Sequence, residues 1–283
     1  MKIIECPRDA MQGLTEFIPS HQKVAYLNQL LQVGFDTIDF GSFVSPKAIP
    51  QMRDTPAVLE KLELTGSTSK LLAIVANKRG AADASNYQQI DYLGFPLSIS
   101  ETFQQRNTHA SISEALNIVS EIQELCVRTN KQQVVYISMG FGNPYGDPYD
   151  TTIVEQFTDI LATLGIKIIS LADTIGVAEP AQIEYLFKTL IHKFPTIEFG
   201  AHLHSNPATS IAKIEAAFNS GCQRFDGALK GFGGCPMAKD ELVGNMATET
   251  IVNFLIAKGK NVNLNHEALK SALDLVPSVF SHI

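Results

Sequence analysis

The stretch GIKIISLADTIGVAEPAQIEYLFKTLIHKFPTIEFGAHLH, residues 165–204, contains the pattern that decides the fold. Its two short apolar runs, 168–172 and 198–203, have the length expected of buried β-strands. Between the two runs, four apolar residues recur at helical spacing: Ile183, Leu186, Phe187 and Leu190. A strand–helix–strand unit of this kind predicts two parallel strands joined by a right-handed crossover.

The same alternation extends over the whole chain. The candidate strands are 2–6, 37–43, 71–75, 90–97, 134–139, 168–172, 198–203 and 224–228. Helices are expected to end near three glycines: Gly34, Gly165 and Gly221. An open doubly wound sheet is the alternative, but no GxGxxG motif follows the first strand. We therefore predict one (β/α)8 TIM-barrel domain, residues 1–283, in which the last barrel helix is followed by an additional C-terminal helical segment.

Composition and charge restrict the class of protein. The chain of 283 residues is 45% hydrophobic and 18% charged, as expected of a protein with a large buried core. Its net charge of -7 argues against non-specific binding to nucleic acid, which requires surplus Lys and Arg. No signal peptide or membrane-spanning apolar run is evident, and the four cysteines show no CxxC spacing. We expect a cytoplasmic protein with reduced thiols and no nucleic-acid or membrane partner.

Polar side chains gather where the predicted strands end, which is the face that carries the chemistry of such barrels. His202 and His204 lie two apart at the end of the seventh strand, so both rings point to one side. Taken alone, the pair could simply fill the barrel mouth. Closure of the barrel also brings Asp9, at the end of the first strand, near them. Two imidazoles and a carboxylate suit a divalent ion, Mg²⁺ or Mn²⁺, with Zn²⁺ not excluded.

Other polar residues at this face each have two interpretations. Arg8 is either a surface ion-pair former or a guanidinium fixed beside the metal to stabilise an oxyanion. Asp173 either caps a turn or supports the site, and we favour support. Asn245 could be a helix N-cap. Cys235 follows two glycines, and a thiol on such a loop can move over a substrate; the remaining cysteines are interpreted as structural, namely Cys6, Cys126 and Cys222.

Several ordered motifs resemble the hydroxymethylglutaryl-CoA lyase family, within the metal-dependent lyase and condensing-enzyme barrels. The resemblance runs from Pro7 to about Asn253. The matching motifs are Pro7-Arg8-Asp9-Ala10-Met11-Gln12, Ser42-Phe43-Val44-Ser45-Pro46-Lys47, Ser100-Glu101-Thr102-Phe103, Asp173-Thr174-Ile175-Gly176-Val177, His202-Leu203-His204, Gly233-Gly234-Cys235-Pro236 and Gly244-Asn245-Met246-Ala247-Thr248-Glu249.

The resemblance implies a function and a set of roles. The reaction is a metal-dependent retro-Claisen cleavage of a 3-hydroxyacyl-CoA, as in leucine degradation and ketone-body formation. The implied metal ligands are Asp9, His202, His204 and Asn245. The implied catalytic residues are Arg8, Asp9, Asp39, His202, Cys235 and Glu249, with Arg8 stabilising an enolate, Cys235 protonating it and Glu249 in a supporting role. The implied substrate-binding residues are Gln12, Ser42, Tyr136 and Thr174.

Three departures from the family pattern bear on the substrate. Asp39 stands where the family usually has Glu, Gly13 where it has Asn, and Val134 where it has Arg. A related thioester therefore remains an alternative substrate.

Other functions also remain open. An acyl-CoA/2-oxo-acid condensing enzyme or a 2-oxo-acid aldolase is the nearest alternative, and a non-catalytic scaffold is the most distant. The chain is compatible with a homodimer or larger homo-oligomer. Four cations near the rim loops could meet CoA phosphates, although solvated charge is the simpler interpretation: Lys47, Lys78, Arg79 and Arg106.

Overall fold

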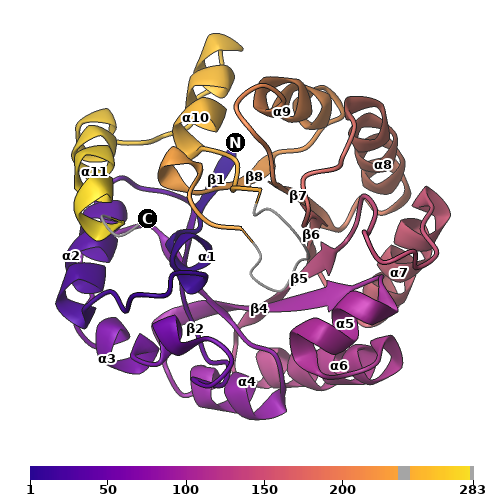
Figure 1. The fold of residues 1–283 in the computed structure, drawn as a ribbon, viewed down its shortest axis with the longest axis horizontal. Helices are drawn as coiled ribbons and strands as arrows, with labels where there is room; N and C mark the ends of the chain where they lie inside the picture. The colour runs from indigo at the N-terminus through magenta and orange to yellow at the C-terminus, as the bar shows by residue number, and fades with distance from the viewer. Residues whose placement is uncertain (235–242, 281–283) are drawn as a thin grey trace.

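Eight parallel strands close into a barrel in the computed structural model, which describes residues 1–234 and 243–280. Each strand pairs with its neighbour in sequence, and β1 pairs with β8 (Figure 1). The strands are β1 (Lys2–Glu5), β2 (Thr37–Ser42), β3 (Lys70–Ile74), β4 (Ile90–Ser98), β5 (Gln132–Ser138), β6 (Ile168–Asp173), β7 (Glu198–Leu203) and β8 (Arg224–Gly227). The predicted barrel is confirmed, and the open sheet is wrong.

Helices form a ring outside the strands (Figure 1). They are α1 (Pro7–Gln12), α2 (Ser20–Leu31), α3 (Thr55–Leu59), α4 (Lys78–Ser85), α5 (Glu101–Thr108), α6 (Ile112–Arg128), α7 (Thr151–Thr163), α8 (Pro180–Lys193), α9 (Ser210–Asn219), α10 (Thr248–Ala257) and α11 (His266–Val279), with 3₁₀ turns η1 (Pro50–Met52) and η2 (Leu229–Gly231). Gly165 and Gly221 follow α7 and α9 with φ of 84° and 94°, so the predicted left-handed ends of these helices are confirmed.

The additional C-terminal helix, α11, packs beside α2 (Figure 1). Gln29 on α2 donates a hydrogen bond to the carbonyl oxygen of Ala268 at 3.0 Å. Past the end of α11, the ring of Phe280 stacks on that of Phe232 in the β8–α10 connection, with ring centroids 4.7 Å apart. This helix therefore supports the rim loop that follows β8. Within the described residues, no helix combines the length and apolar character needed to cross a lipid bilayer.

A β-bulge in β2 changes which side chains face the barrel interior. Asp39 pairs with Leu72 in β3, whereas Gly41 already pairs with Ala73, so Phe40 is the extra residue. As a result Asp39 and Ser42, three apart in sequence, both reach the interior side. Below them the interior is filled by buried apolar side chains of β3, β4, β5 and β6: Leu72, Ile74, Tyr92, Val134, Tyr136 and Ile168.

Glu5, at the end of β1, holds both ends of the connection between β8 and α10. Its carboxyl group accepts hydrogen bonds from the backbone N–H of Leu229 at 2.9 Å and from the Thr248 hydroxyl at 2.5 Å. The side chain is fully buried, and burial raises the pKa of Glu5 to about 8 despite these two hydrogen bonds.

The raised pKa of Glu5 predicts a pH-dependent stability. The folded pKa of about 8 lies above the ordinary value of 4.5, so this contribution is fully present below pH 4.5 and is lost as the pH rises toward 8. Replacing Glu5 by Gln should flatten the free energy of unfolding in that window, where the limiting slope is about 1.4 kcal/mol per pH unit. Urea unfolding at several pH values measures it, with the exposed Glu60→Gln as control. An E5Q curve parallel to the wild-type curve would contradict the assignment.

Candidate active site

Three predicted metal ligands come together at the C-terminal end of the barrel. Asp9 lies in α1, directly after β1, and His202 and His204 lie at the end of β7. One ligand atom from each of the three lies within 4.8 Å of the others. The two imidazole rings have centroids 5.4 Å apart and are tilted by 52°. Two nitrogens and a carboxylate oxygen at these separations form one side of a coordination sphere for a divalent ion.

Arg8 is buried beside this cluster and not on the surface, so the interpretation as a surface ion-pair former is wrong. Its guanidinium donates to Asp39 from Nε at 3.0 and 3.2 Å and from Nη2 at 2.5 Å. Nη1 donates to Asp9 Oδ1 at 3.0 Å and to Gln12 Oε1 at 2.8 Å. The fork is thus held by two carboxylates, which fixes its orientation toward the cavity.

The buried charges around Arg8 compensate one another. Burial raises the pKa of Asp9, but Arg8 and the two histidines outweigh burial, and the pKa ends below its ordinary value. Burial raises the pKa of Asp39 to about 6, and the Arg8 guanidinium limits that rise. Both carboxylates are therefore ionised at neutral pH, as a metal ligand and a partner for Arg8 must be.

The two histidines have different surroundings. Burial lowers the pKa of His202, but the hydrogen bond to Asp226 and its charge outweigh burial, so the pKa lies above the ordinary value. Burial and the neighbouring His202 lower the pKa of His204 to about 4. Neither ring nitrogen of His204 has a hydrogen-bond partner among residues 1–234 and 243–280. A neutral, buried imidazole with both nitrogens unpartnered is available to a metal ion.

Asn245 reaches the cluster from the far side of the β8–α10 connection. Its Nδ2 donates to Asp9 Oδ2 at 2.7 Å and to the carbonyl oxygen of Phe232 at 2.9 Å. Its backbone forms an isolated bridge with His204. The N-cap of α10 is Ala247, so the interpretation of Asn245 as a helix N-cap is wrong.

Asp173 and Lys213 hold the backbone beside the cluster. Lys213 Nζ donates to Asp173 Oδ2 at 2.6 Å and to the carbonyl oxygen of His204 at 2.9 Å. Asp173 also accepts from the backbone N–H groups of Val177 and Ala178. The carboxylate thus closes the turn after β6 and, through a buried lysine that the sequence analysis missed, steadies the end of β7.

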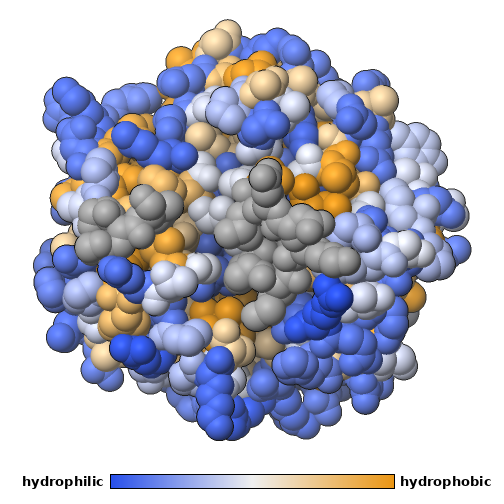
Figure 2. Space-filling view, in the orientation of Figure 1, coloured by the Kyte–Doolittle hydropathy of each residue, from blue (hydrophilic) through white to orange (hydrophobic). Residues whose placement is uncertain are grey.

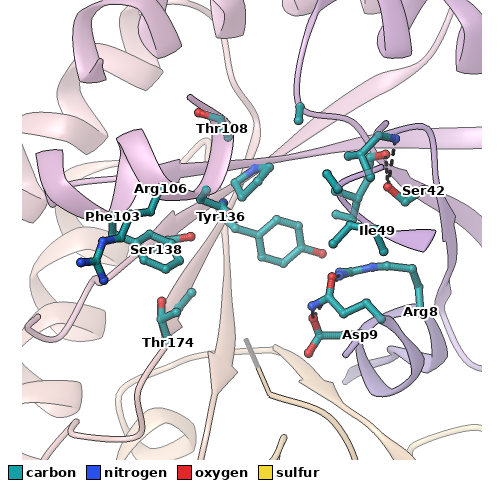
Figure 3. A pocket seen from close by; sticks show the side chains of 18 of the residues that line it. Arg8, Asp9, Ser42, Ile49, Phe103, Arg106, Thr108, Tyr136, Ser138 and Thr174 are labelled. Atoms are coloured by element: carbon teal, nitrogen blue, oxygen red, sulfur yellow. Dashed lines mark hydrogen bonds and ion pairs between the residues drawn. The ribbon is translucent and has the colours of Figure 1, made fainter. Parts of the chain in front are cut away.

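A cavity of about 230 Å³ opens over the cluster and extends toward the loops after β2, β3 and β4. Figure 3 shows the Tyr136 ring reaching from β5 toward Arg8 and Asp9. Hydrophilic side chains make up most of the margin of the face drawn in Figure 2. The predicted substrate-binding residues all line the cavity: Gln12, Ser42, Tyr136 and Thr174. Sequence reasoning assigned no role to further lining residues. Ile74 and Ser138 are the last residues of β3 and β5, Thr108 is the last of α5, and Ile49 and Asn77 lie between elements.

Some predicted residues lie elsewhere. Cys235 falls outside the described residues. Glu249, in the first turn of α10, accepts from the backbone N–H of Lys230 at 3.1 Å. It therefore braces the start of the rim loop and is not a member of the metal cluster. Arg106 lines the cavity and lies over the ring of Tyr145, 4.7 Å from its centroid, whereas Lys78 pairs with Glu121 on the surface.

A second group of metal-type side chains shares His202 and consists of Cys6, His202 and Asp226. Burial, followed by four neighbouring carboxylates, raises the pKa of the Cys6 thiol well above its ordinary value. A protonated thiol is a poor ligand, because metals bind the thiolate. The group with Asp9 and His204 is therefore the better metal site.

Gly233 gives a direct test of how closely the rim loop must approach Asp9. A Cβ there would lie 2.5 Å from Asn245 Nδ2 and 2.9 Å from the Asp9 carbonyl oxygen, and its φ is 106°. Gly233→Ala is expected to weaken Mn²⁺ binding about tenfold and to cost about 1–3 kcal/mol of stability. Gly66→Ala is the matched control, since Gly66 also has positive φ (84°) but an open surrounding. Equal Mn²⁺ affinities in the two variants would contradict the close approach.

A parallel barrel with an aspartate, two histidines and a buried arginine at its C-terminal rim has the side chains of a barrel enzyme with a candidate metal centre. The HMGL-like family matches residues 2–276. The hydroxymethylglutaryl-CoA lyase YngG of Bacillus subtilis is 34% identical over 266 residues, covering 94% of this chain and 88% of that protein. The mitochondrial hydroxymethylglutaryl-CoA lyase of Mus musculus is 29% identical, covering 98% and 84%.

Solved structures give the same result. The HMG-CoA lyase of Acinetobacter baumannii, in complex with coenzyme A and 3-methylmalate, superposes with a TM-score of 0.92 at 29% identity, covering 100% of this chain and 92% of that chain. The Bacillus subtilis HMG-CoA lyase structure has a TM-score of 0.91 at 33% identity, covering 98% and 92%. The chain belongs to the hydroxymethylglutaryl-CoA lyase family, a family of carbon–carbon lyases, and the resemblance predicted from its motifs is confirmed.

Proposed function

We propose that this protein is a divalent-metal-dependent lyase that cleaves 3-hydroxy-3-methylglutaryl-CoA, or a close analogue, into acetyl-CoA and acetoacetate or its counterpart. The observation that carries the proposal is the convergence of Asp9, His202 and His204 beside the buried guanidinium of Arg8. The named relatives support the lyase over the condensing-enzyme, aldolase and scaffold alternatives. We place the protein in the cytoplasm, in keeping with its buried free thiols: Cys6, Cys126 and Cys222.

The residues fit a resident metal ion. His204 offers two unpartnered buried nitrogens, and Asp9 is held as a carboxylate. Asp9, His202 and His204 would hold the ion, with Asn245 close enough to complete the set. Mixed nitrogen and oxygen ligands suit Mg²⁺ or Mn²⁺, with Zn²⁺ as the alternative. When bound, the ion supplies Lewis acidity toward the oxygen atoms of the substrate.

The side chains account for the remaining steps. A base beside the metal site removes the proton of the C3 hydroxyl; Asp9 and His202 are the two candidates, and Asp9 is held in its ionised form. The O–H electron pair becomes the new C=O bond, and the C2–C3 pair passes to the thioester as an enolate. Arg8, oriented by two carboxylates, offsets the enolate charge. Protonation of C2 then gives the acetyl thioester.

One assay tests this function. Metal-loaded protein is incubated with 3-hydroxy-3-methylglutaryl-CoA, and acetyl-CoA and acetoacetate are quantified. The same preparation is offered acetyl-CoA with a 2-oxo acid, which separates cleavage from condensation. Cleavage of a related 3-hydroxyacyl-CoA alone would keep the reaction and change the substrate, as the departures at Asp39 and Val134 allow. Turnover of none of these would refute the proposal.

The thiol of Cys235 is the proposed acid that protonates the enolate carbon. An ordinary thiol with a pKa of about 8.5 is mostly protonated at neutral pH, as an acid must be. Cys235→Ser is expected to lower kcat at least 100-fold without changing the bound-metal content. Enzyme kinetics and elemental analysis measure the two quantities, and full activity in this variant would remove Cys235 from the mechanism.

A further inference from the structure

The two histidines of the candidate metal site differ in their hydrogen bonds: the ring of His202 has a partner, and the ring of His204 has none among the described residues. His202 Nδ1 lies 3.1 Å from Asp226 Oδ2, whereas His204 lacks a partner among the described residues. Asp226 is on β8, the strand adjacent to β7, and is 2% exposed. A carboxylate can only accept a hydrogen bond, so a neutral His202 carries its proton on Nδ1 and leaves Nε2 with a free lone pair.

A second hydrogen bond and a nearby positive charge flank Asp226. Its Oδ2 also accepts from the Ser170 hydroxyl at 3.2 Å. Arg224 Nε lies 4.0 Å from its Oδ1, an ion-pair distance at which neither atom makes a hydrogen bond to the described residues. Arg224 is fully buried inside the barrel and donates from Nη1 to Glu198 at 3.3 Å. A buried carboxylate needs such a counter-charge, because removal from water is otherwise costly.

Gly200 makes room for this arrangement. A Cβ at position 200 would lie 2.8 Å from Ser170 Oγ and 3.0 Å from Arg224 Cδ. Only a residue without a side chain at this point of β7 lets both groups approach Asp226. The strand that carries the two histidines is therefore also shaped for the support beneath them.

We propose that Asp226 is a positioning residue that fixes the tautomer and ring orientation of His202, so that Nε2 faces the metal site, and that Arg224 is the counter-charge that allows this carboxylate to be buried. The inference rests on the metal site in the proposed function. It makes the two histidines unequal: His202 is oriented by its neighbour, whereas His204 is positioned only through its backbone and the packing around it. Carboxylates that orient ligating histidines typically change metal affinity by 10–100-fold.

The test uses the metal-free protein, two substitutions of Asp226 and one control variant. Histidine ¹⁵N NMR at alkaline pH is expected to show His202 protonated on Nδ1 in the wild type. Asp226→Leu removes the acceptor and should lower the affinity for Mn²⁺, measured by calorimetry, by 10–100-fold, with loss of the Nδ1–H signature. Asp226→Asn retains a carbonyl oxygen that can accept the same hydrogen bond, and should recover the tautomer and most of the affinity. Ser170→Ala is the control, since it removes the other hydrogen bond to Oδ2 and should stay within about threefold of wild type.

Two results overturn the proposal. One is a wild-type His202 protonated on Nε2, which can be read even if Asp226→Leu does not fold. The other is a folded Asp226→Leu variant with wild-type Mn²⁺ affinity. If the wild type binds no Mn²⁺, Mg²⁺ or Zn²⁺, the proposed function fails, while the tautomer of His202 in the metal-free protein still decides whether Asp226 orients the ring.

Discussion

Replacing Arg8 by Met is expected to lower kcat/KM for 3-hydroxy-3-methylglutaryl-CoA by at least 1,000-fold. Removal of a single hydrogen-bond donor to a developing oxyanion commonly lowers kcat by about 100–1,000-fold. Arg8 also supplies a full positive charge that offsets the negative charge of the enolate. The variant should also lose about 3–5 kcal/mol of stability, because Asp39 is left as a buried, unpaired carboxylate. Steady-state kinetics and urea unfolding measure the two effects.

The double variant Arg8→Met with Asp39→Asn separates chemistry from folding. Removing both charges of a buried pair costs much less than removing one, so most of the stability should return. Activity should remain at the level of the single variant, because no guanidinium is restored. Recovery of turnover together with stability would show that Arg8 serves the fold alone.

Replacing His204 by Leu is expected to raise the dissociation constant for Mn²⁺ by at least 100-fold and to abolish turnover. Replacing His204 breaks no hydrogen bond of its ring within the described residues, so the effect on metal binding can be separated from an effect on folding. An apolar side chain of similar size leaves no new unsatisfied partner behind. Thermal stability of the metal-free protein should therefore be unchanged or higher.

Calorimetric titration with Mn²⁺ and thermal denaturation of the metal-free protein test this pair of expectations. His192→Leu, at an exposed position of α8 outside the cavity lining, serves as the matched control for the change from His to Leu. Retained Mn²⁺ affinity in His204→Leu would refute the proposed ligand set. Loss of stability without loss of affinity would mean that the ring has a packing role only.

The barrel could be predicted from the sequence because alternation of apolar runs and helical stripes is a local signal repeated eight times. The pair His202 and His204 was found for the same reason, since a period of two places neighbouring polar residues on one side of a strand. The same rule applied to Arg224 and Asp226 on β8 would have identified a second polar pair inside the barrel. It was missed because the run 224–228 was interpreted only as a strand.

Other parts of the site depend on contacts that no local pattern encodes. In β2, strict alternation places Asp39 and Gly41 on one side, and only the bulge lets Ser42 line the cavity while Asp39 contacts Arg8. The ion pairs of Arg8 with Asp39 and Asp9 join α1 to β2. They could be identified only in the folded structure. The sequence also gave no sign that Lys213 would reach the backbone of His204.

The hydrogen bonds around Asn245 show what sets the place of this fourth candidate ligand. Leu229 and Thr248 are bound to the same Glu5 carboxyl group. On either side of Asn245, Ser205 N–H donates to the carbonyl oxygen of Gly244 at 3.1 Å and Met246 N–H donates to that of Leu203 at 3.2 Å. The backbone that carries Asn245 is therefore attached to the end of the same strand that carries His202, so the two approach Asp9 as parts of one hydrogen-bonded unit.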